Sequence, residues 1–352
     1  MSGDATLAQT ATKNEKVSTP SPTPAIQGAL TVTVLVPTYR RTNDLSRCLA
    51  AIARQTRPAD EVLLVARDTD EETHHFLASA RGIALIAALS PALRLIPVTV
   101  AGQVAALNAG LDAATCDVIA IVDDDAAPRL QWLERVVAHF ARDARVGGVG
   151  GRDWPNHDPA QMRDARSVVG CVQWHGRVIG NHHLGVGAAR EVDLLKGANM
   201  SYRREAIRNI RFDTRLKGNG SEINNDMAFS LAVQRAGWKN VYDPDVAVDH
   251  FPAQRHDEDQ RGRFNAFATA NVIHNETLTL LEHLPGAVRR SVFLWWAFLV
   301  GSRPAPGVAQ IPRLIAARDR HALSRWRATL GGRIAGWRTF CESRRNQQSR
   351  RG

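Results

Sequence analysis

The sequence has few cysteines, few lysines and no long apolar run, and each shortage excludes a class of protein. Its four cysteines are widely separated, at Cys48, Cys116, Cys171 and Cys341. No pair has the close spacing of a zinc site or a redox motif, and the pattern indicates no disulfide framework. We therefore expect a reducing, cytoplasmic setting.

The apolar runs are too short for a membrane-spanning helix. The longest, residues 292–300, is less than half the length that a bilayer requires. The first 27 residues lack the basic start and apolar stretch of a secretory signal. We expect a disordered leader over residues 1–28 and no segment that crosses a membrane by itself.

Lysine is so scarce that arginine supplies most of the positive charge. The chain has 45 Lys and Arg residues and a formal net charge of +10, yet only five residues are lysines. Arginine suits nucleic acid, anionic membranes and phosphate-bearing substrates, because its planar guanidinium binds phosphate oxygens in pairs. A biased genomic base composition would also favour it. Because the basic residues form no recognisable nucleic-acid-binding module, nucleic acid is not an expected partner.

Apolar segments alternate between strand and helix patterns over the first 140 residues. We predict strands at 31–36, 61–65, 95–98 and 118–122, with Pro37 ending the first strand. Helices are predicted to begin at Asn43 or Asp44, to cover residues 70–81, and to begin again at Gly102 and near Trp132. Such alternation predicts an α/β fold with a mostly parallel sheet, flanking helices and right-handed crossovers.

The pattern changes after Val146. Gly147, Gly148, Gly150 and Gly151 are predicted to break regular structure, and residues up to 192 to form loops and short strands. A helix is predicted from Asn225 to Gly237, followed by strands at 241–244 and 246–248. Beyond residue 251 the chain is predicted to be helical and increasingly basic, ending in a disordered tail.

Three consecutive acids, Asp123, Asp124 and Asp125, follow directly on the apolar run 118–122. Ligands bind open α/β sheets beyond the carboxyl ends of such strands. Clustered carboxylates repel one another unless a cation joins them, and Mg²⁺ or Mn²⁺ can bridge carboxylates to a diphosphate. The alternative is a solvated acidic turn.

Five segments, in this order, resemble the family-2 glycosyltransferases. They are residues 34–40 (VLVPTYR), the Asp triplet, residues 197–200 (GANM), Asn225-Asp226 and Gly237-Trp238. The resemblance implies a GT-A fold, a Rossmann-like nucleotide-diphospho-sugar transferase fold, over residues 29–251. A C-terminal helical region at 252–340 and a basic tail at 341–352 would follow it.

The resemblance also implies inverting, metal-dependent transfer of a sugar from a nucleotide diphosphate to an acceptor hydroxyl. Asp125 and Asp123 would hold a divalent cation, manganese or magnesium, with His250 as a further ligand. Asp226 would be the catalytic base that takes the acceptor's proton. The alternatives are a simple helix cap for Asp226 and a structural role for His250.

The family pattern places other residues on the two substrates. Donor-binding residues would be Pro37, Tyr39, Arg40, Asp68, Gly102, Asn108, Asp123 and Asp124, although Asn108 also suits a helix surface. Acceptor-side residues would be Gly197, Asn199 and Asn225.

The chain departs from the family pattern at two positions. Ala66 stands where the family commonly has an Asp that contacts uracil, and Asn225 stands where it usually has a Glu. Asp68 could replace the uracil contact, or Arg67 could favour another base or a phosphate. Family frequency favours a UDP-sugar donor. A catalytically inactive module that binds nucleotide sugars or a partner is the alternative function.

The acceptor carries no readable motif. By resemblance it would be a glycan or a lipid-linked glycan, in the assembly of cell-surface glycans or exopolysaccharide. The Trp-rich run near residue 295, flanked by arginines, suits either a membrane interface or a helix packed on the catalytic domain. Many members of the family extend lipid-linked glycans at the cytoplasmic face of the membrane. The resemblance therefore favours the first interpretation, a peripheral contact of this chain with the inner face of the cell membrane.

Overall fold

The computed structural model describes residues 29–89, 93–155, 164–254 and 263–349. The expected leader at 1–28 lies outside these residues. The strands are β1 (Val32–Thr38), β2 (Glu61–Arg67), β3 (Leu93–Val98), β4 (Val118–Ile121), β5 (Ala126–Pro128), β6 (Val146–Pro155), β7 (Cys171–Val172), β8 (Val178–Ile179), β9 (Arg190–Val192), β10 (Met200–Arg203) and β11 (Lys239–His250). The helices of the sheet region are α1 (Thr42–Ala53), α2 (Glu71–Ala78), α3 (Ala80–Ala88), α4 (Gln103–Ala113), α5 (Trp132–Arg142), η2 (His182–Leu184) and α6 (Asn225–Arg235).

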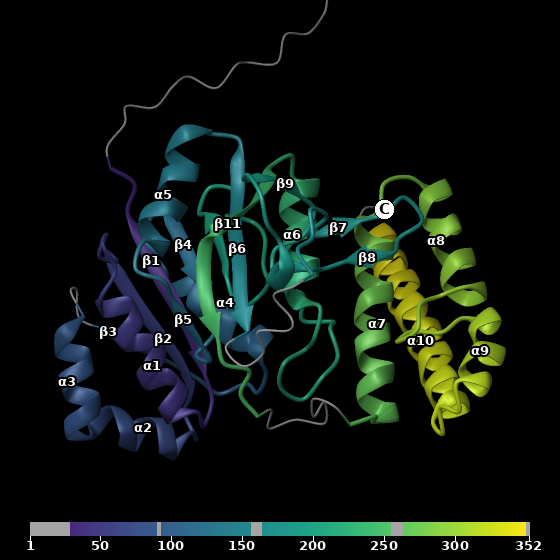
Figure 1. The fold of residues 1–352 in the computed structure, drawn as a ribbon, viewed down its shortest axis with the longest axis horizontal. Helices are drawn as coiled ribbons and strands as arrows, with labels where there is room; N and C mark the ends of the chain where they lie inside the picture. The colour runs from purple at the N-terminus through teal and green to yellow at the C-terminus, as the bar shows by residue number, and fades with distance from the viewer. Residues whose placement is uncertain (1–28, 90–92, 156–163, 255–262, 350–352) are drawn as a thin grey trace, which may run out of the picture.

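A nine-stranded sheet forms the centre of this region (Figure 1). Its order is β3-β2-β1-β4-β10-β6-β11-β5, with β9 beside β11. The run β3-β2-β1-β4 is parallel, as the repeating βα pattern predicts. β10 then lies antiparallel between β4 and β6, so the far half of the sheet is mixed. The carboxyl ends of β1, β2 and β4 therefore meet at one edge.

Alternate residues of β1 supply the two faces of the core. Val34 packs in a cluster with Leu45 of α1 and Phe140 of α5. Its neighbour Leu35 belongs to the opposite cluster, with Leu107 of α4 and Phe229 of α6. Apolar residues on both faces of β1 thus require helices on both sides of the sheet, and this sheet has them.

The predicted elements of the first half are confirmed with three corrections. β1 continues through Pro37, because β4 pairs only with residues 32–35 and Pro37 has a neighbour on one side only. α1 begins at Thr42 after Arg41, so neither Asn43 nor Asp44 caps it. A second helix, α3, follows α2 where the sequence predicted one, because Ser79 caps it through a hydrogen bond from the Gly82 N–H.

The prediction that glycines break the chain after Val146 is wrong. This stretch forms β6, the central strand between β10 and β11. A Cβ on Gly148 would lie 2.3 Å from Asn240 Oδ1, and one on Gly151 would lie 1.8 Å from the Val246 carbonyl oxygen. The glycines allow β11 and its neighbours to approach closely, rather than interrupting the strand.

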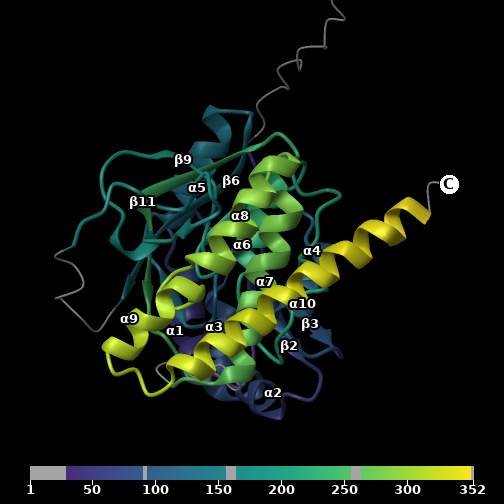
Figure 2. The same ribbon diagram turned by 90° about the vertical axis from the view of Figure 1, so that its right-hand side faces the viewer.

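A helical region lies beside the sheet and contains α7 (Ala266–His283), α8 (Ala287–Leu299), η3 (Val308–Gln310), α9 (Ile311–Ala316) and α10 (Ala322–Ser349). α10 crosses α7, and its C-terminal end projects beyond the other helices (Figure 2). Gly332 and Gly336 permit this contact, since a Cβ on either would lie within 2.6 Å of an α7 carbonyl oxygen. The prediction of a disordered end is wrong over residues 344–349, which continue α10; Ser343 in the same helix accepts a hydrogen bond from Arg215 Nη1 (2.9 Å).

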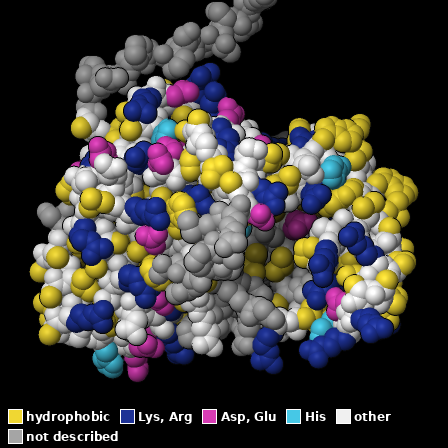
Figure 3. Space-filling model, in the orientation of Figure 1, with side chains coloured by type: hydrophobic (Ala, Val, Ile, Leu, Met, Phe, Trp, Pro, Cys, Tyr) yellow, Lys and Arg dark blue, Asp and Glu magenta, His cyan; other side chains and the backbone are white. Residues whose placement is uncertain are grey.

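On the face in Figure 3, Lys and Arg side chains are dispersed among acidic and apolar ones rather than gathered in one basic patch. Within the described ranges, no helix is both long enough and apolar enough to span a bilayer.

Candidate functional site

A cavity of about 260 Å³ opens at the carboxyl ends of β1, β2 and β4. Asp123, Asp124 and Asp125 line it from the loop that follows β4, and Pro37 and Tyr39 line it from the end of β1. Gly102 lines it from the turn that begins α4. The structure thus brings the Asp triplet and three of the predicted donor-side residues to one cavity.

The pKa is raised for the first two acids and lowered for the third. Burial, reinforced by the charge of Asp125, raises the pKa of Asp123 to about 6. Burial also raises the pKa of Asp124 to about 7, although Arg41 and Thr38 oppose it. Thr38 Oγ1 donates to Asp124 Oδ2 (2.8 Å) and Arg41 Nη1 donates to Asp124 Oδ1 (3.0 Å). Asp124 is therefore engaged within the protein.

Asp125 belongs to a chain of alternating charges. Its Oδ1 lies 3.3 Å from His250 Nε2, and His250 Nδ1 lies 3.5 Å from Asp153 Oδ2, which also pairs with Lys196. Burial alone would raise the pKa of Asp125, but His250 outweighs it and holds that pKa at about 2. Burial alone would lower the pKa of His250, but the two carboxylates raise it to about 9. In this arrangement both imidazole nitrogens face carboxylates.

Asp153 and Lys196 were not predicted as site residues. Asp153 was missed because its segment was interpreted as a glycine-rich loop, whereas it lies near the end of β6 with 2% of its surface exposed. Its position near the carboxyl end of a strand could have identified Asp153, just as the same kind of position identified Asp123.

Asp226 lies in the first turn of α6, where its carboxylate is oriented by backbone amides. Its Oδ2 accepts from the Gly197 N–H (2.9 Å) and its Oδ1 accepts from the Met227 N–H (2.8 Å). The side chain is partly exposed, and its charge is close enough to raise the pKa of Asp123 further. Asp226 therefore borders the triplet without lining the cavity itself.

Gln103 connects the triplet to the position where the sequence departs from the family. Gln103 Nε2 donates to Asp123 Oδ1 (3.2 Å), and Asn225 Nδ2 donates to Gln103 Oε1 (3.2 Å). Asn225 is buried and also donates to the Ser221 carbonyl oxygen (2.9 Å). It therefore positions Gln103 against Asp123.

Another acid occupies the N-terminus of α4. Glu222 Oε2 accepts from the Gln103 N–H (2.8 Å) and the Val104 N–H (3.3 Å). Gly102 makes room for it with φ of 113°, since a Cβ at this position would lie 1.9 Å from Glu222 Oε1. The positive end of this helix is thus already neutralised by the protein.

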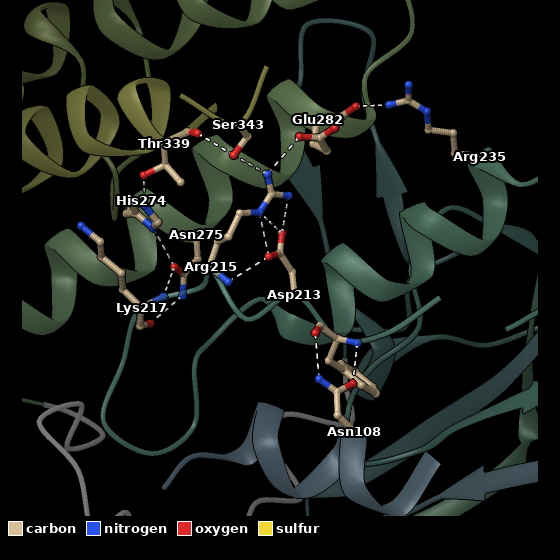
Figure 4. A network of polar contacts seen from close by, with 11 residues as sticks. Asn108, Asp213, Arg215, Lys217, Arg235, His274, Asn275, Glu282, Thr339 and Ser343 are labelled. Atoms are coloured by element: carbon tan, nitrogen blue, oxygen red, sulfur yellow. Dashed lines mark hydrogen bonds and ion pairs between the residues drawn. The ribbon is translucent and has the colours of Figure 1, made fainter. Parts of the chain in front are cut away.

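Other predicted residues lie away from the cavity. Asn108 donates to the Phe212 carbonyl oxygen (2.9 Å) and accepts from the Phe212 N–H (2.8 Å). These two hydrogen bonds join α4 to the loop that contains Phe212 (Figure 4). Asn199 is fully buried, where it accepts from Trp132 Nε1 and donates to the Val246 carbonyl oxygen. Asp68 is exposed. Arg40 has φ of 54°, and its backbone N–H donates to Asp70.

Asp123 and Asp125 fit a hard divalent cation. Both present carboxylate oxygens to the cavity, and their mutual repulsion raises the pKa of Asp123. In the part of the chain that is described, no three His, Cys, Asp or Glu residues are grouped so as to enclose a metal. Mg²⁺-type sites commonly combine one or two carboxylates with substrate phosphates. His250 fits less well, because both of its nitrogens face carboxylates.

Comparison with known proteins gives a family and a fold. The family described as "Glycosyltransferase like family 2" matches residues 29–265. Glycosyltransferase AglE of Haloferax volcanii is 31% identical over 136 residues, which cover 38% of this chain and 43% of that protein. The match therefore spans less than half the length of this curated relative.

Two solved structures are similar over most of the chain. Mannosyltransferase PcManGT from Pyrobaculum calidifontis, in complex with GDP-Man and Mn²⁺, has a TM-score of 0.53 and 21% identity, covering 89% of this chain and 88% of that one. S. aureus TarS 1-349 has a TM-score of 0.56 and 16% identity, covering 87% and 81%. At these identities the structures show a shared fold.

Proposed function

The chain belongs to the glycosyltransferase-like family 2, and on that premise we propose that it transfers a sugar from a nucleotide diphosphate to an acceptor hydroxyl with inversion at the anomeric carbon. It is a glycosyltransferase with the GT-A fold. One observation carries the proposal beyond the family. The only acids that line the described cavity are Asp123, Asp124 and Asp125, at the strand end where a diphosphate would dock.

Asp123 and Asp125 would hold a divalent cation together with the donor's diphosphate. When bound, such a cation neutralises the charge that develops on the departing diphosphate. Asp124 has a different task, since its two hydrogen bonds fix the loop through Thr38 and Arg41. Gln103 orients Asp123 from the α4 side. We therefore assign cation binding to the first and third acids and loop positioning to the second.

Asp226 would take the proton from the acceptor hydroxyl. The Gly197 and Met227 amides fix its orientation, and each carboxylate oxygen retains a second lone pair to accept a proton. A positioned base of this kind contributes roughly 10²–10⁴-fold to the rate. Its place beside the triplet, yet outside the cavity, is consistent with attack from the acceptor side.

The acceptor and the cellular setting are proposed from the family alone. We propose a glycan or lipid-linked glycan acceptor, in the assembly of cell-surface glycans or exopolysaccharide. The PcManGT and TarS structures were solved with GDP-Man and with UDP-GlcNAc, respectively, which supports a nucleotide-sugar donor without choosing the base.

A peripheral membrane contact is a further part of the proposal. Val288, Trp295 and Leu299 lie on one side of α8, with exposed fractions of 71%, 68% and 46%. Figure 3 shows apolar side chains gathered with arginines over the part of the surface that α8 and α9 occupy. Indole and guanidinium groups together favour an anionic membrane interface. Flotation with vesicles containing anionic lipid tests it, and protein that stays at the bottom of the gradient rejects it.

Donor binding and transfer test the main proposal together. We expect a nucleoside diphosphate to raise the melting temperature in the presence of Mn²⁺, and to do so much less in its absence. We also expect slow metal-dependent hydrolysis of the matching nucleotide sugar. Donor binding without any turnover would favour an inactive module, and no binding of any diphosphate would reject the donor site.

A further inference from the structure

Arg67, at the end of β2, lines the same cavity as the Asp triplet. β1 lies between β2 and β4, so Arg67 is separated from the triplet by two strand spacings. Two spacings amount to roughly 10 Å. This is about the length that a ribose and a diphosphate occupy, so a nucleotide with its phosphates at Asp123 would bring its base to Arg67.

The Arg67 guanidinium has no protein partner. Among the described residues it makes no hydrogen bond and no ion pair, and its Nε is buried without an acceptor. Arg41, which lines the same cavity, also has a buried Nε without an acceptor, but its Nη1 is paired with Asp124 at 3.0 Å. A buried donor without a partner is costly. A ligand that supplies adjacent acceptors would remove that cost.

Apart from the Asp triplet, no acid side chain lines the cavity that Arg67 lines. Val98, the β3 residue paired with Arg67, lines the cavity together with Ala101 and Ala106 from the start of α4, and these apolar side chains suit a flat ring. Ala66 offers no polar group, and Asp68 is exposed and does not line the cavity. The carboxylate that would accept the imide N–H of uracil is therefore missing from the cavity wall. The expectation of a UDP-sugar then rests on family frequency alone.

Resting on the proposed donor site, we infer that Arg67 binds the O6 and N7 edge of guanine, so that the donor is a GDP-sugar. Guanine presents two adjacent acceptors on this edge, which match the paired N–H groups of arginine. Adenine presents one acceptor beside an amino donor, and uracil presents O4 beside an imide N–H. Both place a hydrogen-bond donor against the donors of Arg67, so guanine is the complementary base.

Calorimetric titration of the full chain with Mn²⁺ and GDP, IDP, UDP or ADP tests the inference. IDP keeps the O6 and N7 edge but lacks the 2-amino group, so it isolates the edge that Arg67 binds. We expect GDP and IDP to bind about 5- to 150-fold more tightly than UDP and ADP, the range for a bidentate arginine–guanine pair.

Two substitutions make the test specific. Arg67→Gln removes one charge and presents one donor and one acceptor, the pattern that pairs with adenine. We expect it to lose most of the GDP and IDP affinity and to bind ADP more tightly than the native chain does. Arg67→Lys keeps the charge but lacks the paired N–H groups of the guanidinium, and should lose the preference for GDP. Arg81→Gln, an equal charge change at an exposed position on α3, should leave all four affinities unchanged.

The failures are distinguishable. If the native chain binds UDP as tightly as GDP, the base assignment is wrong while the donor site survives. If Arg67→Gln weakens all four diphosphates equally, Arg67 binds phosphate and not the base, which also overturns the inference. If no diphosphate binds with or without Mn²⁺, the proposed donor site itself is wrong.

Discussion

The cavity edge of the sheet and the contact between the 212–217 loop and the helical region both concentrate buried polar groups, but they use them differently. In the loop contact the charges of Asp213, Arg215 and Glu282 lie beside one another (Figure 4). Arg215 pairs with Asp213 (2.7 Å) and lies 3.4 Å from Glu282. At the cavity edge, adjacent acids outnumber their cations and Arg67 has no protein partner. Buried polarity alone therefore does not mark a site; an unbalanced charge facing a cavity does.

The largest expected effect is on the transfer rate, and it comes from replacing Asp226 beside the cavity. Asp226→Asn keeps an oxygen for the Gly197 N–H but cannot take a proton. We expect the transfer rate to fall roughly 10²–10⁴-fold with donor affinity nearly unchanged, as kcat and donor Kd would show. Asp213→Asn is the matched control, and should lower stability while leaving the rate per folded molecule intact. An Asp226→Asn enzyme with native kcat would leave only the helix-cap role.

The second largest effect is on stability, and it comes from removing hydrogen bonds between the 212–217 loop and α7. Asn275 is fully buried, accepts from the Lys217 N–H, and donates to the carbonyl oxygens of Lys217 and Ile223. Asn275→Ala removes these three hydrogen bonds and the one between Asn275 Oδ1 and His274 Nδ1 (2.9 Å). We expect a loss of about 2–4 kcal/mol in the free energy of unfolding, because each buried group left unpaired costs about 1–3 kcal/mol. Urea denaturation measures it. A loss below about 0.5 kcal/mol would show that the loop repacks.

The sequence predicted the cavity edge better than the loop contact, and the reason is physical. A strand's apolar run and the acids after it are adjacent in the chain, so the Asp triplet could be identified from local pattern. Asn199 and Asn108 match family positions, but their partners are more than 40 residues away in the chain. No local pattern indicates that these amides hydrogen-bond inside the fold. Distant pairing also explains why β6 was not predicted, because its glycines fit against β11, which lies far along the chain.

A third prediction compares two helices that begin in the same way. Gly102 precedes α4 with φ of 113° and ψ of 152°, and Gly286 precedes α8 with φ of 71° and ψ of 156°. A Cβ on Gly102 meets Glu222 at 1.9 Å, whereas one on Gly286 meets nothing within 4 Å.

Both alanine variants should lose about 1–3 kcal/mol from backbone strain. We expect Gly102→Ala alone also to weaken donor binding, because Glu222 must leave the α4 N-terminus next to Gln103. Chemical denaturation and donor titration separate the two effects. Equal donor affinity in both variants would remove Gly102 from the donor side.

The smallest effect is a pH dependence in the helical region. Burial lowers the pKa of His283, at the end of α7, to about 4. The unfolded chain, with an ordinary pKa near 6.5, binds this proton first as pH falls. The folded state is therefore destabilised progressively between pH 6.5 and 4, and His283 contributes no such slope above pH 6.5.

His283→Gln should accordingly flatten the stability profile between pH 6.5 and 4 relative to the native chain, with no change in slope from pH 7 to 8. Subtracting the two profiles, measured as urea midpoints, cancels the carboxylates that titrate in both proteins. Parallel profiles would mean that His283 is hydrated in the folded state. Since this histidine lies away from the cavity, donor binding should keep the same pH dependence in both proteins, which separates the chemistry of the helical region from that of the sheet edge.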